Sequence, residues 1–373
     1  MRKQTILYLA TAIAIAAGTV IAILIAQGYR LDVGQKEIEK SGLLLIESTP
    51  TDAKIFINGK LVDTTNATLS LSPKIYDIQL AKEGFSTWEK KVKIQPGLAT
   101  EIDALLISTS PQLTPLTTTG VTLLKTNPQR NQIAYTTRKG SEPGLWILDL
   151  ATPPLVGLVK ENPYILAEDT ADQKFSLAEN LQWGPKGKEL LITLNRKGHV
   201  LAKPRNGILK QATSSAKPTT SVWKKEKTDI IAKLVNKLEI PKKLEEVAKD
   251  PNTLWAPDEE KFLYTKERDE YIEYHIFNGE NPLGVGRKRH YLPLKVKKDL
   301  QVKVNWHSTS EHLIIKSGTT VSLIEMEGTN KTEIFSGHLA SSKVVPTPNG
   351  ANLIVLTSFK QDDQPNFYAV SLR

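Results

Sequence analysis

Histidine is the residue type in this chain best suited to acid–base chemistry and metal binding near neutral pH. The sequence of 373 residues contains six histidines and no cysteine. Without cysteine, disulfides, thiolate metal sites, iron–sulfur clusters and cysteine nucleophiles are excluded. No His-Glu-x-x-His motif is present. We therefore expect no metal and no cofactor; a metal site assembled from distant histidines is the alternative. The histidines are His199, His275, His290, His307, His312 and His338.

Other catalytic motifs are also missing from the sequence. There is no Gly-x-Ser-x-Gly nucleophile elbow. Gly284 and Gly286 supply two of the three glycines of a dinucleotide fingerprint, and no helix is predicted after them. Gly187-Lys188-Glu189 lacks the Ser or Thr of a phosphate-binding loop. We expect no catalytic residues, and the chain is predicted not to be an enzyme.

Positive charge is concentrated in one segment, residues 287–303. It contains seven Lys or Arg and one Asp, in a chain whose net charge is +9. One interpretation is an exposed loop and a strand edge protected by lysines. The other is a site for an anionic partner, such as lipid head groups, a wall polymer or an acidic protein surface. The predicted basic patch consists of Arg287, Lys288, Arg289, Lys295, Lys297 and Lys298.

Five segments share one pattern that predicts a repeated hairpin. Trp opens three of them, Pro stands third in four, and an apolar residue stands eighth in all five. Pro fixes φ for the turn, and the apolar run after it is typical of a buried strand. Repeats spaced some tens of residues apart indicate a solenoid or a propeller. The segments are TNPQRNQIAYTT (126–137), WGPKGKELLITL (183–194), WAPDEEKFLYTK (255–266), WHSTSEHLIIKS (306–317) and PTPNGANLIVLT (346–357).

The spacing of these motifs favours a β-propeller in residues 121–373. At roughly 40–45 residues per blade, this length predicts about six blades, five of them visible and one diverged. The widest gap between motifs contains apolar residues at helical spacing, which predicts a helical insertion at about 224–250. We expect Trp183, Trp255 and Trp306 to pack between blades.

The amino-terminal residues 1–30 predict a membrane anchor. Arg2 and Lys3 precede an uncharged run of 22 residues, Thr5 to Ala26. At ~1.5 Å per residue this run is about 33 Å long as a helix, enough to cross a hydrocarbon core of ~30 Å. A secretory signal usually has a shorter apolar core, so we expect a retained anchor instead of a cleaved signal. The positive-inside rule places the amino terminus in the cytoplasm and the bulk of the chain outside.

Between anchor and propeller, the sequence predicts a small β-sandwich. Residues 31–41 form a charged spacer, and residues 42–107 contain short β-like runs joined by turn signals, among them Asn58-Gly59. Short strands joined by tight turns are typical of a sandwich. Residues 108–120, rich in Pro, Ser and Thr, are predicted to be a linker. The expected fold class is therefore all-β, with one transmembrane helix, a sandwich and a propeller.

The order of signals in residues 42–107 resembles the PEGA domain. The shared features are a Thr-Pro turn, an apolar hairpin ending in Asn-Gly, a Pro-x-x-Tyr turn and a Lys-x-Gly-Phe strand end. Lys74 departs from this pattern, because Gly is usual there. The resemblance implies an extracytoplasmic sandwich without catalytic residues. The matching residues are Thr49-Pro50, Ala53, Ile55 to Gly59, Ser72 to Tyr76 and Lys82 to Phe85.

The repeated motif is similar to that of TolB-type propellers, which are related to WD40 repeats. Residues Trp255 to Tyr264 fit best, whereas Trp306-His307-Ser308 has lost the Pro and Pro346 replaces the Trp. Together the anchor, the PEGA-like domain and the propeller look like an arrangement found in bacterial surface proteins.

We predict a single-pass membrane protein with a non-enzymatic binding or scaffold role at the cell surface. The expected partners are the membrane and an envelope protein or anionic wall polymer, and nucleic acid is not expected. The alternative is an enzyme, a hydrolase or lyase acting on envelope glycans at the propeller channel. The sequence does not specify an oligomeric state.

Overall fold

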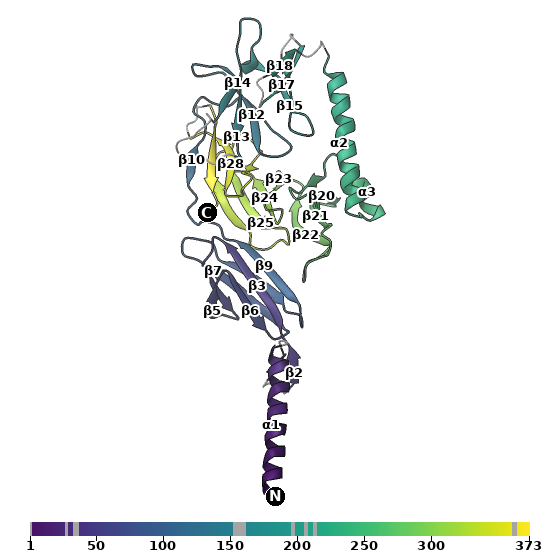
Figure 1. The fold of residues 1–373 in the computed structure, drawn as a ribbon. Helices are drawn as coiled ribbons and strands as arrows, with labels where there is room; N and C mark the ends of the chain where they lie inside the picture. The colour runs from purple at the N-terminus through teal and green to yellow at the C-terminus, as the bar shows by residue number, and fades with distance from the viewer. Residues whose placement is uncertain are drawn as a thin grey trace. The chain divides into compact units, whose positions relative to one another are not determined.

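The structure is a computed structural model in which strands dominate. The chain divides into two compact units, the first consisting of residues 1–106 and 282–288 and the second of residues 107–281 and 289–373 (Figure 1). The residues described are 2–26, 29–32, 37–151, 162–194, 198–204, 208–211, 215–359 and 364–373.

Helix α1 (Arg2–Ala26) matches the predicted apolar run (Figure 1). Its window Ile6–Ile23 is long and apolar enough to cross a membrane, and its side chains are exposed in the isolated chain. By length and composition this helix is a membrane span or a signal sequence. In the expected spacer, β1 (Tyr29–Asp32) and β2 (Glu37–Lys40) pair antiparallel.

The predicted sandwich consists of two sheets around one core. One sheet has the order β6-β3-β9 and the other β5-β4-β7-β8. Alternate residues of each long strand are buried, as in β9, because one face packs on the opposite sheet. The core centres on Leu44, Ile46, Ile55 and Leu80, all fully buried. The strands are β3 (Gly42–Thr49), β4 (Lys54–Ile57), β5 (Lys60–Thr64), β6 (Ala67–Leu71), β7 (Ile75–Ala81), β8 (Trp88–Lys93) and β9 (Ala99–Leu105).

The hairpin between β4 and β5 confirms the Asn-Gly signal. Asn58 and Gly59 both have positive φ angles, 48° and 77°. A two-residue turn with two positive φ angles matches the twist of the strands that it joins, and Asn and Gly adopt such angles at least cost.

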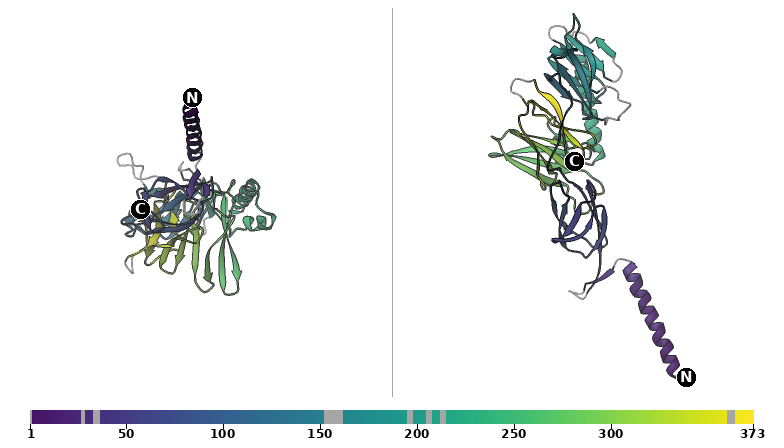
Figure 2. Two further views of the ribbon diagram at one scale, coloured as in Figure 1. Left: turned by 90° about the horizontal axis from the view of Figure 1, so that it is seen from below. Right: turned by 90° about the vertical axis from the view of Figure 1, so that its left-hand side faces the viewer.

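The second unit contains five four-stranded sheets, one for each repeated motif (Figures 1 and 2). The motif covers the end of the first strand, the turn and the second strand of each sheet. The first sheet consists of β11 (Leu123–Thr126), β12 (Gln132–Thr137), β13 (Gly144–Asp149) and β14 (Tyr164–Glu168), and the second of β15 (Asn180–Trp183), β16 (Leu190–Leu194), β17 (Gly198–Lys203) and β18 (Ile208–Gln211). The third sheet consists of β19 (Leu254–Trp255), β20 (Lys261–Arg268), β21 (Tyr271–Asn278) and β22 (His290–Lys297), and the fourth of β23 (Val302–Trp306), β24 (His312–Ser317), β25 (Thr320–Glu325) and β26 (Thr332–Ser336). The fifth sheet consists of β27 (Val345–Pro346), β28 (Asn352–Thr357) and β29 (Asn366–Ser371), together with β10 (Leu113–Pro115).

The first strands of the sheets lie at the centre of the unit. Strand β11 contacts β15, and β19 contacts β23. The fifth sheet is completed by β10, which precedes all the others in sequence but pairs antiparallel with β29, the last strand. This pairing joins the two ends of the propeller. Within the segment 108–120, expected to be a linker, residues 113–115 thus form a strand of the fifth sheet.

The helical insertion lies between the second and third sheets, as predicted. It begins earlier than the expected residue 224, with α2 (Lys217–Lys237), and continues with α3 (Lys242–Lys249) (Figure 1). Pro218 stands in the first turn of α2, where its missing N–H leaves no bond unmade. A short 3₁₀ helix, η1 (Phe175–Leu177), precedes β15. The described residues form five blades and not a sixth, because the extra length is used by this insertion and by loops.

Packing follows the repeat closely. The eighth residue of every motif is fully buried, namely Ile133, Leu190, Phe262, Leu313 and Leu353.

The repeated tryptophans join neighbouring elements. The Trp183 indole donates to the Lys125 carbonyl in β11 at 2.9 Å, and the Trp306 indole donates to the Leu254 carbonyl in β19 at 2.8 Å. Each indole therefore bonds to the first strand of the preceding sheet. The Trp255 indole instead donates to Ala248 of α3 at 3.2 Å, since the insertion precedes the third sheet. The contacts of Trp183 and Trp306 agree with the predicted packing between blades, whereas Trp255 packs against the insertion.

Candidate functional site: a cationic cavity at the centre of the propeller

The five motif turns have the same backbone geometry. In each, the N–H of the fifth motif residue donates to the carbonyl of the second, with distances of 2.8 to 3.2 Å. The fifth residue has a positive φ in every copy, from 55° to 66°. Glycine adopts this conformation readily, whereas a residue with a Cβ does so at a cost. The fifth residues are Arg130, Gly187, Glu259, Ser310 and Gly350.

Arg130 uses this strained position to reach the centre of the propeller. Its Nη2 donates to the Trp255 carbonyl at 3.1 Å and its Nη1 to the Trp306 carbonyl at 3.4 Å. One side chain thereby connects the first blade to the inner strands of the third and fourth. Strained backbone of this kind is concentrated at functional sites in proteins.

The guanidinium of Arg130 carries its charge into a poorly solvated environment. Burial lowers its pKa to about 10, so it stays protonated near neutral pH. The two bonded carbonyls are neutral, and no carboxylate among the described residues forms an ion pair with Arg130. A charge placed in this way is stabilised when an anion comes within reach.

A cavity of about 470 Å³ adjoins Arg130; we call it the central cavity. Four of its lining residues are cationic and none is a carboxylate. It is bounded by the first strands of four blades and by β24. The lining residues are Thr126, Asn127, Pro128, Arg130, Leu254, Lys303, Val304, Asn305, Ile314, Lys316, Ser342, Lys343, Val344 and Val345.

Two of the cations lie directly opposite each other. Lys303 of β23 and Lys316 of β24 are register partners on adjacent strands. Like charges in this arrangement destabilise a sheet. Burial and the charge of nearby Lys125 lower the pKa of a third cation, Lys343. The repulsion among these groups would be relieved by a bound anion.

The cavity also contains a buried polar atom without a partner. The Oγ1 of Thr126 is buried and makes no hydrogen bond to any described residue. Buried hydroxyls are nearly always hydrogen-bonded. The Thr126 hydroxyl is thus an unsatisfied buried group in a residue that lines the cavity.

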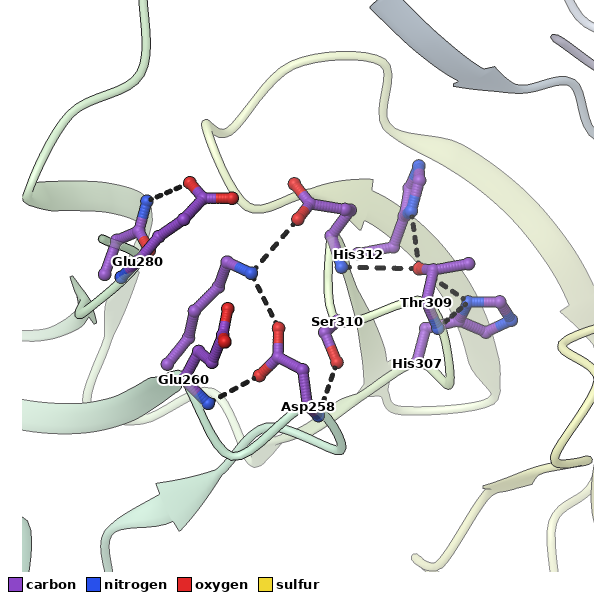
Figure 3. Close-up of polar contacts among 10 residues, drawn as sticks. Asp258, Glu260, Glu280, His307, Thr309, Ser310 and His312 are labelled. Atoms are coloured by element: carbon purple, nitrogen blue, oxygen red, sulfur yellow. Dashed lines mark hydrogen bonds and ion pairs between the residues drawn. The ribbon is translucent and has the colours of Figure 1, made fainter. Parts of the chain in front are cut away.

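The acidic and histidine-containing turns of the third and fourth blades have a different role (Figure 3). Buried Lys261 pairs with Asp258 at 2.6 Å and with Glu311 at 3.2 Å. The Ser310 hydroxyl accepts from the Asp258 N–H at 3.0 Å. Burial opposes protonation of Lys261, but the two carboxylates raise its pKa. These contacts join the third blade to the fourth.

The two closely spaced histidines are buried and connected through one hydroxyl. Thr309 Oγ1 lies 3.1 Å from His307 Nδ1 and 3.0 Å from His312 Nδ1 (Figure 3). His307 Nε2 lies 3.2 Å from the Gly350 carbonyl, where it donates as the neutral tautomer. Burial, His312 and Arg373 lower the pKa of His307 to about 3 against the opposing effect of Gly350. No group of three metal-ligating side chains occurs among the described residues.

The predicted basic patch is divided between the two ends of β22. Arg287, Lys288 and Arg289 precede the strand, whereas Lys295 and Lys297 lie near its other end. At ~3.3 Å per residue the strand separates Arg289 from Lys295 by roughly 20 Å, and Arg287 and Lys288 belong to the first unit. The patch as a binding site stays a prediction.

Several of these charges already have partners. Arg289 donates to the carbonyls of Asn278 and Glu280 at 3.2 and 2.5 Å. Lys295 lies 3.5 Å from Glu273, and Lys298 lies 3.0 Å from Glu267.

Sequence reasoning missed the central cavity. The feature of the sequence that could have indicated the cavity is Arg130, because it stands at a motif position where two of the five copies have Gly. The cations Lys303, Lys316 and Lys343 gave no signal, because their proximity depends on the assembled blades.

Comparison with known proteins identifies the first domain. Residues 41–109 match the PEGA domain. This confirms the resemblance predicted for residues 42–107. No curated protein matches the chain.

Solved structures similar to the chain include several propellers. TolB from Acinetobacter baumannii is 13% identical, with coverage of 79% of this chain and 60% of that one and a TM-score of 0.25. TolB from Agrobacterium tumefaciens, described as putative, is 11% identical, with coverage of 76% and 87% and a TM-score of 0.24. An oligogalacturonate lyase from Vibrio parahaemolyticus is 7% identical, with coverage of 90% and 99% and a TM-score of 0.31. The chain thus spans less than two thirds of the Acinetobacter protein.

Proposed function

We propose that this chain is a membrane-anchored, extracytoplasmic binding protein whose propeller holds an anionic group of its ligand in the central cavity. The observation that carries the proposal is the charge of the lining, with four cations and no carboxylate. Anions are attracted most strongly by cations in a recess with low-dielectric walls. The ligand is then an anionic polymer or protein of the envelope.

The proposed topology depends on the apolar helix and the residues before it. Helix α1 serves as a retained anchor, and Arg2 and Lys3 keep the amino terminus in the cytoplasm. The PEGA match at residues 41–109 supports an extracytoplasmic location for the sandwich and the propeller. Protease treatment of intact cells should then cleave the propeller; cleavage only after permeabilisation would refute this topology.

Calorimetric titration of the full chain in detergent micelles tests the binding site. The probes are two small anions, glucuronate and inorganic phosphate. Arg130→Gln should lower the affinity by at least about tenfold, the loss expected for a hydrogen bond to a charged group. Exposed Arg138 provides the control, since Arg138→Gln makes the same change in net charge on the first blade and should bind as the parent does. Equal affinity of the two variants would refute the proposal.

The alternative of a glycan-acting enzyme at the same place stays a prediction. Such enzymes usually use two carboxyl groups about the scissile bond. Incubation of defined acidic glycans with the full chain, and measurement of their chain length afterwards, tests it directly.

A further inference from the structure

A second cavity lies on the other side of the first motif turn. It has a volume of about 710 Å³ and is bounded by the turns of the first two blades, by β17 and by α2. We call it the amide cleft, because four of its residues carry amide side chains. The lining residues most relevant to binding are Asn127, Gln129, Asn131, Gln132, Trp223 and Lys188.

One turn separates the amide cleft from the central cavity. Pro128 and Arg130 line the central cavity, Gln129 and Asn131 line the amide cleft, and Asn127 lines both. A ligand that crosses this turn therefore meets a strongly cationic surface on one side and amide groups on the other.

The turn is held rigidly by its own side chains. Asn127 Oδ1 accepts from the N–H groups of Asn131 and Gln132 at 3.0 and 3.1 Å. Its Nδ2 donates to Asn131 Oδ1 at 2.6 Å. A turn fixed in this way presents Gln129 and Arg130 in constant positions, which lowers the entropy lost on binding.

The opposite wall of the cleft is equally well defined. The Trp223 ring of α2 packs on Gly184, where an added Cβ would lie 3.0 Å from the ring. Lys186 pairs with Glu226 of the same helix, and Lys203 lies 3.7 Å from Glu189. The insertion is thus fixed against the second blade, and the paired charges leave the cleft less cationic than the central cavity.

The chemistry of the cleft suits hydroxyl groups. An amide side chain offers both donors and an acceptor, as a sugar hydroxyl does. Gln129 is exposed and makes no hydrogen bond to the described residues, so its amide is available. Its amide oxygen lies close over Gly187, where a Cβ would overlap it.

A peptide fits this cleft less well. Uncharged peptide segments commonly bind proteins by adding a strand to a sheet edge, by laying a helix in an apolar groove or by docking on aromatic side chains. The amide cleft is bounded by turns, by β17 and by a helix, its one aromatic residue, Trp223, is buried, and most of its lining residues carry polar side chains.

We propose that the central cavity and the amide cleft are adjacent subsites for an acidic oligosaccharide. The acidic substituent, a carboxylate or phosphate, lies beside Arg130, and the neighbouring uncharged sugar lies against Gln129 and Asn131. This inference rests on the proposed function, because it assigns the ligand class of the same site.

Titration of the full chain in micelles with hyaluronan tetrasaccharide tests the inference, because uronate and uncharged sugars alternate in this probe. It should bind more tightly than glucuronate alone. Gln129→Ala should weaken the tetrasaccharide about fivefold, the loss expected for one uncharged hydrogen bond. The same variant should leave glucuronate affinity unchanged. Exposed Gln301 is the matched control, and Gln301→Ala should alter neither affinity.

The outcomes separate this inference from the proposed function. If Gln129→Ala leaves the tetrasaccharide affinity unchanged, or if a tetra-aspartate peptide binds more tightly than the tetrasaccharide, the ligand class is wrong. If Arg130→Gln leaves every affinity unchanged, the proposed function itself is wrong. Competition by glucuronate or by inorganic phosphate identifies which acidic substituent occupies the central cavity.

Discussion

The Nη2 of Arg130 donates to the carbonyl of Trp255 at 3.1 Å, across 125 positions of sequence. Arg130 has a φ of 55°, and Trp255 opens the motif of the third blade. The contact connects a strained turn to the inner strand of a distant blade. It is this relationship that leaves a charged guanidinium beside the central cavity.

Because the backbone at Arg130 is strained, we expect substitution by glycine to relieve the strain while it removes the guanidinium that binds the anion. Arg130→Gly and Arg130→Gln both remove the guanidinium, but only glycine relieves the left-handed backbone. Relief of roughly 1–2 kcal/mol, less the entropy of glycine in the unfolded chain, should make the Gly variant more stable by about 1 kcal/mol. Urea denaturation monitored by tryptophan fluorescence measures this difference. A Gly variant no more stable than the Gln variant would show that the turn is unstrained.

Lys303 and Lys316 lie opposite each other, so removal of one of the two charges should raise the stability of the propeller and weaken anion binding. Lys316→Gln removes the repulsion with Lys303 and should stabilise the propeller by about 0.5 kcal/mol. It should also weaken binding of glucuronate. Lys331, exposed beside β26, is the matched control, and Lys331→Gln should change neither property. Loss of stability in Lys316→Gln, measured in the same urea experiment, would contradict this account.

His307 predicts a loss of stability in acid. Its pKa is about 3 in the folded chain, below the ordinary value of 6.5, so the unfolded chain binds the proton more readily. The stabilising effect is complete above pH 6.5 and falls as the pH decreases toward 3. Between pH 6.5 and 5 the free energy of unfolding should decrease by about 2 kcal/mol from this group.

The control for this effect removes the titrating group. His307→Gln should be less stable at pH 8, because the buried contacts change, but it should lose less stability between pH 6.5 and 5 than the parent. Exposed His338→Gln should behave as the parent does. Equal acid sensitivity of parent and His307→Gln would exclude His307 as the cause.

Removal of the Trp306 indole should markedly lower the free energy of unfolding. This side chain is fully buried and donates to the Leu254 carbonyl at 2.8 Å. Trp306→Phe removes this hydrogen bond and part of the buried side chain, and should cost about 2 kcal/mol of unfolding free energy. Trp146, which is half-buried and donates at 3.3 Å in an exposed position, is the control. A cost for Trp306→Phe no greater than for Trp146→Phe would contradict the joining role.

The sequence was sufficient for features that depend on local pattern. The eighth motif residues, the Asn58-Gly59 turn and the helix of residues 2–26 are predictable from periodicity and turn chemistry, and the structure confirms them. The described residues form five of the about six expected blades, and residues of α2 and α3 take up part of the length from which that number was predicted. The pairing of β10 with β29 joins segments some 250 residues apart, which no local signal predicts.

The candidate site was not predictable for a related reason. The basic patch was inferred from neighbours in sequence, and in the structure Glu273 of β21 and Glu267 of β20 pair with two of its lysines. The cations of the central cavity are scattered over more than 200 positions and become neighbours only when the blades assemble.

The location of a bound anion tests the central claim most directly. Crystals of the full chain soaked with selenate provide an anomalous signal that places the anion without assumptions about affinity. We predict a peak in the central cavity within about 3 Å of the Arg130 guanidinium, and its loss in Arg130→Gln. Peaks confined to Arg287, Lys288 and Arg289, with none in the cavity, would contradict the account.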